Sequence, residues 1–141
     1  MNSLKLTAAQ QSRIRQALQL VPFAQLLGIE LESFEPGSAV LALNLREELR
    51  QNNGVVHGGV IASLIDTATA LAILTVIPDS EKVTTVDLTV SYLRPLIAGR
   101  ARAQAKVLRV GRRIIAVSAE VASESGTLAA TALSTYMRLG N

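Results

Sequence analysis

The segment 51–66 is where residue types and spacing point most directly to chemistry. It contains the pattern Gly54-x-x-His57-Gly58-Gly59, followed by an apolar stretch that predicts a helix. A glycine pair at a loop-to-helix junction lets another molecule approach the backbone closely. The first N–H groups of a helix have no partners within it and suit a developing negative charge. The N–H of Gly58 or of Gly59 is therefore a candidate oxyanion donor, and the alternative is a tight helix start needed only for packing.

Asp66 is the only charged residue between Arg50 and Asp79. Its predicted helix is built almost entirely from apolar and small residues. Burying an unpaired carboxylate is costly, so this side chain either finds hydrogen-bond donors or has a chemical role. The neighbouring glycine junction favours the chemical role, as a nucleophile or as the general base for a water molecule. The residues leave both roles open.

Gly58 and Asp66 cannot both touch one carbonyl group from the same chain. They are eight residues apart in the sequence, which is roughly 12 Å along a helix axis. If both take part, the site must combine Asp66 of one subunit with Gly58 of another. Two antiparallel helices at a two-fold interface would give two such sites per dimer.

The elements that must position these residues follow from periodicity and turn residues. A helical segment within residues 1–27 has Thr7 as a suitable N-cap and is interrupted at Pro22. A long apolar helix is predicted over residues 57–77, and Pro78 stops it. Strands are predicted at 29–33, 39–45, 83–93, 98–110, 113–123 and 127–139.

This order of elements predicts the class of fold. Short connections between consecutive strands imply an antiparallel sheet, and one apolar helix and one sheet must cover each other. We therefore predict a single α+β domain over residues 1–141, with a sheet curled around a helix that is buried on most of its surface. Because the helix is so apolar and the sheet so open, we expect a homo-oligomer, either a dimer or a dimer of dimers.

Composition argues against several classes of function. The 141 residues are 49% hydrophobic and 18% charged, which suits one folded domain. The absence of cysteine and the single histidine argue against disulfides, a thiol nucleophile and a zinc site. Aromatic residues make up 3% of the chain, too few for a platform on which bases stack. We expect no metal, no cofactor and no nucleic-acid partner.

The charge pattern and the N-terminus bear on partners and location. The net charge is +3, and residues 94–113 hold seven cations and no acid. That stretch could meet phosphate groups or form a solvated strand face. Asp66 within the apolar helix argues against a membrane span, and residues 1–15 lack the apolar region of a signal peptide. We expect a cytoplasmic protein without a membrane partner.

The pattern Gly54-x-x-His57-Gly58-Gly59, with Asp66 nine residues after the histidine, resembles the signature of the hotdog-fold thioesterases, in particular the PaaI-like group. The order of predicted elements is similar to that family over essentially the whole chain. The resemblance implies a hotdog fold and hydrolysis of acyl-CoA thioesters without metal or cofactor. It implies that Asp66 is the catalytic carboxylate, that the Gly58 N–H polarises the thioester carbonyl, and that His57 shapes this junction.

The resemblance also implies supporting residues. The amide three residues before Gly54 is Gln51 here, which would orient water or the carbonyl; Asn52 or Asn53 could take that role instead. The hydroxyl ahead of a Val-Asp pair is Thr85 here, which would hold the attacking water, with Thr84 as the alternative. Gly59, Asn53 and Thr84 count as candidate substrate contacts. The family binds the CoA nucleotide near its surface with arginine or lysine, and the candidates are Arg94, Arg100, Arg102, Arg112 and Arg113.

Two other functions remain open. One is a hotdog module that binds acyl-CoA without turnover, such as a sensor, although no output domain is visible. The other is a hydratase or dehydratase, which needs a differently placed histidine. For a thioesterase, the acyl tunnel is expected between the central helices of two subunits, and the scarcity of aromatic residues favours an aliphatic acyl group.

Overall fold

The computed structural model describes residues 5–140. The first four residues of the predicted N-terminal helical segment, and Asn141, lie outside the described residues. The elements are α1 (Ala8–Gln19), α2 (Pro22–Leu27), β1 (Glu30–Glu35), β2 (Ser38–Asn44), a 3-10 turn (Glu47–Leu49), α3 (Gly58–Leu74), β3 (Lys82–Tyr92), β4 (Arg100–Val110), β5 (Ile114–Ala122) and β6 (Leu128–Gly140).

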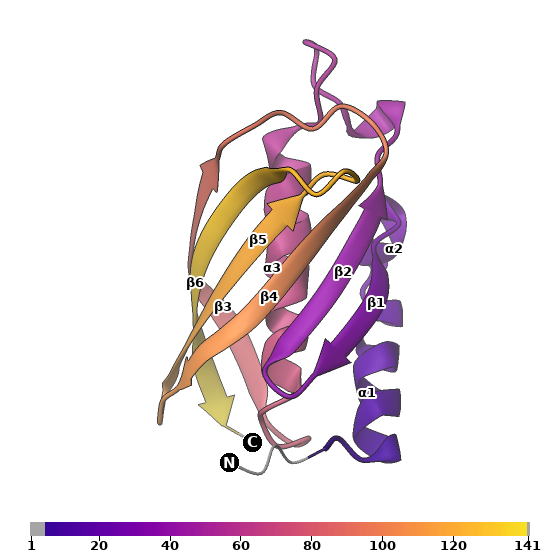
Figure 1. The fold of residues 1–141 in the computed structure, drawn as a ribbon. Coiled ribbons are helices and arrows are strands. Elements are labelled where there is room, and N and C mark those ends of the chain that lie inside the picture. Colours follow the sequence, from indigo (N-terminus) through magenta and orange to yellow (C-terminus); the bar gives the residue numbers. More distant parts are fainter. Residues whose placement is uncertain (1–4, 141) are drawn as a thin grey trace.

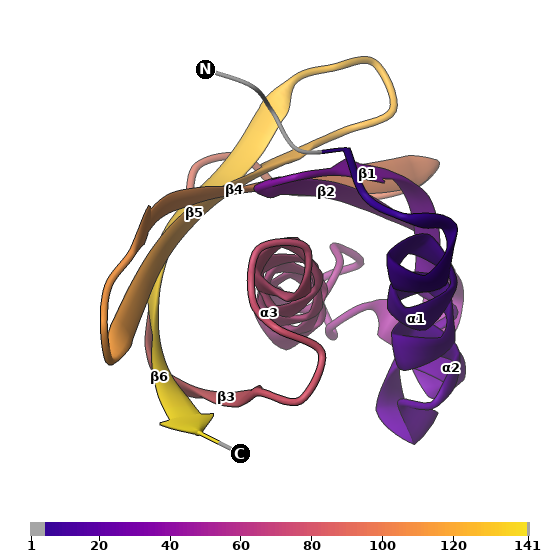
Figure 2. The same ribbon diagram turned by 90° about the horizontal axis from the view of Figure 1, so that it is seen from below.

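The predicted N-terminal helical segment forms two helices. α1 begins with a capping box, in which the Thr7 hydroxyl accepts the Gln10 N–H and the Gln10 side chain accepts the Thr7 N–H. Pro22 opens α2, where its missing N–H costs nothing. α2 ends at Gly28, whose φ of 84° favours glycine. Both helices lie beside α3, across the open side of the curled sheet (Figure 2).

The strands form one antiparallel sheet of six in the order β1-β2-β4-β5-β6-β3. After β2 the chain passes along the concave side of the sheet as α3 and returns at the opposite edge as β3 (Figure 1). β1 and β3 are therefore the two edge strands. The sheet curls around α3 (Figure 2), which confirms the predicted α+β fold with a central helix.

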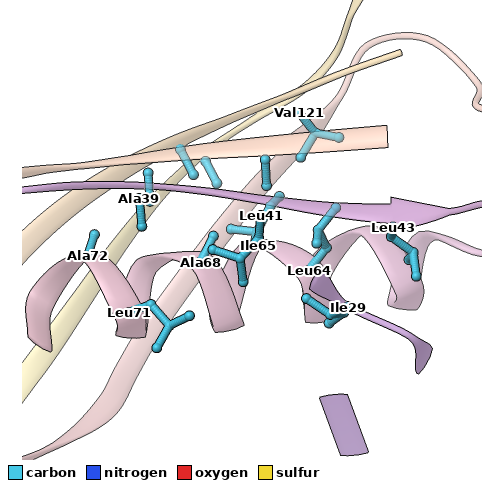
Figure 3. Packing of buried hydrophobic residues seen from close by; sticks show 14 of the residues in the cluster. Ile29, Ala39, Leu41, Leu43, Leu64, Ile65, Ala68, Leu71, Ala72 and Val121 are labelled. Carbon is cyan, nitrogen blue, oxygen red and sulfur yellow. The ribbon is translucent and has the colours of Figure 1, made fainter. Parts of the chain in front are cut away.

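The core lies between α3 and the concave face of the sheet. Ile65 and Ala68 of α3 are fully buried beneath Leu41 of β2 (Figure 3). Full burial of each large aliphatic side chain stabilises the fold by about 1.5–3 kcal/mol. Small side chains on the inner faces of β4 and β5 let the helix approach the sheet closely: Ala101, Ala103, Ala105 and Ala119 are all buried.

α3 differs from the prediction in length and in burial. It begins at Gly58 and ends at Leu74, three residues before the predicted end. The Thr75 hydroxyl stops it by donating to the Ala72 carbonyl oxygen and accepting the N–H of Gly37. The helix is also less buried than expected, because one stripe at helical spacing is only partly covered. This half-buried stripe is Ala62, Ser63, Asp66, Thr67, Ala70 and Leu74.

Candidate active site

Asp66 lies on the half-buried stripe of α3, and two hydroxyl groups from the sheet lie within hydrogen-bond distance of the same carboxylate oxygen. Thr85 Oγ1 of β3 donates to Asp66 Oδ1 at 2.9 Å. Tyr136 Oη of β6 is 3.0 Å from that oxygen. Among residues 5–140, Oδ2 has no hydrogen-bond partner. Within this part of the chain the carboxylate is thus held through Oδ1 only.

The register of the sheet explains why these two hydroxyls meet Asp66. Thr85 and Tyr136 are cross-strand partners, and an irregularity in the pairing follows at once, between Thr85 and Asp87. Such bulges re-aim side chains next to functional sites. Thr84 pairs instead with Met137, so Thr85 is the threonine that bonds to Asp66.

Tyr136 is a site residue that the sequence analysis missed. Its side chain is 2% exposed, and its oxygen also lies 2.8 Å from Thr69 Oγ1. Burial raises the pKa of the Tyr136 phenol, so the group keeps its proton. In the sequence Tyr136 is one aromatic residue within an apolar strand, 70 residues from Asp66, and nothing local marks it.

An apolar cavity of about 340 Å³ opens beside Asp66. Its walls come from α1, α3 and β3, with Thr84, Thr85 and Tyr136 near the carboxylate. The remaining lining is almost wholly aliphatic: Ala17, Leu18, Val21, Thr67, Ala70, Leu71, Leu74 and Val83. One wall of this cavity comes from α1, and the expected tunnel between the central helices of two subunits stays a prediction.

At the N-terminus of α3, the rings of His57 and Tyr92 lie against two glycines, Gly58 and Gly59. His57 is the N-cap, and its Nδ1 accepts the Gly59 N–H at 2.8 Å. A Cβ at Gly59 would lie 2.9 Å from that Nδ1. Any side chain at this position would therefore crowd the His57 ring, which explains why the residue is glycine. The Tyr92 hydroxyl donates to the Gly58 carbonyl oxygen at 2.8 Å, and its ring lies 3.3 Å from a Cβ placed at Gly58. Of the two candidate donors, the Gly59 N–H is therefore occupied.

The Gly58 N–H is the first of the helix and has no acceptor within the described part of the chain. A second cavity of about 280 Å³ opens here, and its lining includes Gly58, Gln51, Tyr92 and Arg94. Tyr92 was not among the predicted site residues. An anion at this point would meet the positive end of the α3 dipole.

The remaining predicted contacts are not all brought together. Asn53 is exposed in the turn before α3 and is not part of either cavity wall. Arg94 borders the Gly58 cavity and donates to the Leu128 carbonyl oxygen at 3.0 Å. Arg112 and Arg113 lie in the β4–β5 hairpin and line neither cavity. Arg100 and Arg102 both pair with Glu32, and Arg100 pairs with Glu30 as well.

The two cavities lie along the same helix but hold different halves of the predicted site. Asp66 borders one and Gly58 the other. β3 contacts both halves of the predicted site: its Thr85 bonds to Asp66, and its Tyr92 bonds to Gly58. No group of three or more His, Asp or Glu side chains within residues 5–140 is arranged to hold a metal ion. None of the helices described here is long and apolar enough to cross a membrane.

Comparison with known proteins bears on both the fold and the chemistry. The family model of the thioesterase superfamily matches residues 53–130. The medium/long-chain acyl-CoA thioesterase YigI of Salmonella typhimurium is 34% identical over 145 residues, covering 86% of this chain and 94% of that protein. A mutant of the phenylacetic acid degradation protein PaaI from Thermus thermophilus is 36% identical with a TM-score of 0.78, over 84% of this chain and all of that one. A thioesterase family protein from Silicibacter pomeroyi shares the fold, with a TM-score of 0.89 at 24% identity over 94% of this chain and 99% of that one.

Proposed function

Because the chain belongs to the thioesterase superfamily, we propose that it hydrolyses acyl-CoA thioesters to the free acid and CoA. Asp66 acts as base or nucleophile, and Gly58 of the partner subunit supplies the oxyanion donor. One observation carries the proposal: the Asp66 carboxylate is held through Oδ1 beside an apolar cavity, while Oδ2 has no hydrogen-bond partner among the described residues. Relatives named as acyl-CoA thioesterases support the same chemistry.

The proposed reaction has two routes that share their first and last steps. The thioester carbonyl oxygen accepts a hydrogen bond from the Gly58 N–H, which stabilises the negative charge that develops there. Asp66 Oδ2 then either takes a proton from an attacking water molecule or attacks the carbonyl carbon itself. The second route forms a mixed anhydride that water hydrolyses. In both, the C–S bond breaks, the CoA thiolate leaves and takes up a proton, and the acid is released.

A homodimer formed along β3 would complete this site. β3 pairs with β6 along one edge, its other edge pairs with no strand of the described residues, and its Val86 is 54% exposed. A second copy pairing antiparallel, about a two-fold axis near Leu88, places Thr85 of one subunit opposite Tyr92 of the partner subunit. Asp66 of each subunit then comes close to Gly58 of the partner subunit, and the half-buried stripes of the two α3 helices face each other.

The cavity beside Asp66 supports an aliphatic acyl group as substrate. Its lining away from the carboxylate is aliphatic, and an apolar pocket with a few convergent polar groups is typical of small-molecule sites. The relative YigI is named for medium- and long-chain substrates. Arg94 lines the Gly58 cavity. Its positive charge suits the phosphate groups of CoA, which supports this cavity as the place where the CoA portion binds.

Release of CoA from a panel of acyl-CoAs tests the function directly. We expect turnover that is higher for medium and long aliphatic chains than for acetyl-CoA or an aromatic acyl-CoA, because the cavity buries aliphatic surface. A thiol reagent reads CoA alone, since the protein contains no cysteine. Binding of these ligands without any turnover would overturn the proposal and favour a binding module. Hydration of an enoyl-CoA without thiol release would favour a hydratase.

Mixing two inactive variants tests whether the site spans two subunits. Asp66→Asn and Gly58→Pro, unfolded and refolded together, should regain about a quarter of the parent activity, because half of the dimers are mixed and each holds one intact site. Each variant refolded alone is the control. If both halves of the site came from one chain, no activity would return.

A further inference from the structure

Tyr136 is a buried phenol that the proposed mechanism does not use, yet it contacts the same carboxylate oxygen as Thr85. Its Oη lies 3.0 Å from Asp66 Oδ1 and 2.8 Å from Thr69 Oγ1. We propose that Tyr136 is a positioning residue for hydrolysis: together with Thr85 it holds Oδ1 of Asp66, so that Oδ2 is the oxygen that meets water or substrate. This inference rests on the proposed function, in which Asp66 is the reacting carboxylate.

The hydroxyl hydrogens of Thr69, Thr85 and Tyr136 can all be placed on acceptors around Asp66. An ionised carboxylate only accepts, so Thr85 and Tyr136 both donate to Asp66 Oδ1. Thr69 then donates either to Tyr136 Oη or to the Asp66 carbonyl oxygen, which lies 3.0 Å from it. That carbonyl oxygen also lies 2.9 Å from Tyr136 Oη, so the Tyr136 hydroxyl hydrogen is shared between the Asp66 carbonyl oxygen and Asp66 Oδ1. Every hydroxyl hydrogen has an acceptor, and none is left to bond to Oδ2.

The two donors lie opposite each other on neighbouring strands. Thr85 and Tyr136 are paired residues of β3 and β6, and Tyr136 is packed in the core. Burial raises the pKa of the Tyr136 phenol, which favours the protonated form that can donate. Two fixed donors on one oxygen restrict rotation of the carboxylate. Holding a reacting group in one orientation raises the reaction rate without tightening substrate binding.

A purely structural role for the hydroxyl is the competing explanation. A buried tyrosine needs a hydrogen-bond partner, and Thr69 alone would provide one. The two explanations differ in what happens when the oxygen atom is removed. Loss of a structural hydrogen bond weakens the fold. Loss of a positioning contact lowers kcat in a protein that still folds and still binds substrate.

Tyr136→Phe removes only this oxygen, and Ser134→Ala is its matched control. Ser134 lies on the same strand, is also buried, and donates to the Asp87 carbonyl oxygen at 2.9 Å rather than to Asp66. We expect Tyr136→Phe to lower kcat by about tenfold to a hundredfold with KM nearly unchanged, because a small displacement of a reacting group can cost that much. Ser134→Ala should stay within a factor of about two of the parent, as substitutions away from the reacting groups do when folding is retained.

Thermal unfolding and a crystal structure complete the test. Both variants should unfold at similarly lowered temperatures, and in the Tyr136→Phe structure the Asp66 carboxylate should leave its present orientation. Equal kcat values for the two variants, or an Asp66 carboxylate that stays in place, would overturn the inference about Tyr136. The proposed function would survive that result if Asp66→Asn were still inactive. A parent protein without turnover would overturn both.

Discussion

Replacing Gly58 by proline should lower kcat by about 10²- to 10³-fold while the protein stays folded, because it removes the proposed oxyanion donor. Gly58 is the first residue of α3, the helix position where proline fits best. The backbone of His57, with φ −62° and ψ 134°, is the extended conformation that a following proline requires. The change therefore removes the Gly58 N–H and leaves the helix intact.

Gly58→Ala is the matched control, because it adds a Cβ and keeps the N–H. That Cβ would lie 3.3 Å from the Tyr92 ring, which is a tight contact with a side chain that can shift slightly. We expect the alanine variant to retain activity within about tenfold of the parent, a loss smaller than that of a missing oxyanion donor. The kcat ratio of the proline and alanine variants reports the loss of the N–H together with the added ring carbons of proline, since both variants carry a Cβ. Equal activity in both would assign the oxyanion donor to another group.

Asp66→Asn should lower kcat by about 10²- to 10⁴-fold, the usual contribution of a general base, and by at least as much if Asp66 is the nucleophile. Asparagine keeps the shape of the side chain, and its oxygen can still accept from Thr85 and Tyr136. KM should change little, since the cavity walls are untouched. Thiol release from the best acyl-CoA of the panel is the measurement.

Asp87→Asn is the control for removing an acid near the site. Asp87 lies on β3 two residues from Thr85, is exposed, and lines neither cavity. Its replacement should leave kcat within a factor of about two. An Asp66→Asn variant as active as Asp87→Asn would mean that another group performs the chemistry. A single turnover in oxygen-18 water tests the nucleophilic route, because label in the Asp66 carboxylate requires that Asp66 was the nucleophile.

The relative placement of residues close together in sequence could be predicted from the sequence alone. The pattern from Gly54 to Gly59 and the acid at Asp66 lie on one loop and one helix, so their relation follows from helix geometry. The same geometry predicted that Gly58 and Asp66 are too far apart to share a site within one chain, and the structure places them at different cavities. The strands could be located because alternation and turn residues are local signals. The end of α3 was misjudged because the Thr75 hydroxyl bonds to Gly37, a residue distant in sequence.

Contacts between distant segments were decided by the tertiary structure. The partners of Asp66 depend on the β3–β6 register and on the irregularity after Thr85, and a shift of one residue would turn these side chains to the other face. The cavity wall from α1 depends on how that helix packs across the open side of the sheet. The choice between Gly58 and Gly59 depends on the orientation of the His57 ring. Sequence therefore determined the chemical groups and their local spacing, whereas only the packed sheet and helices determined which oxygen of Asp66 is held and which is free.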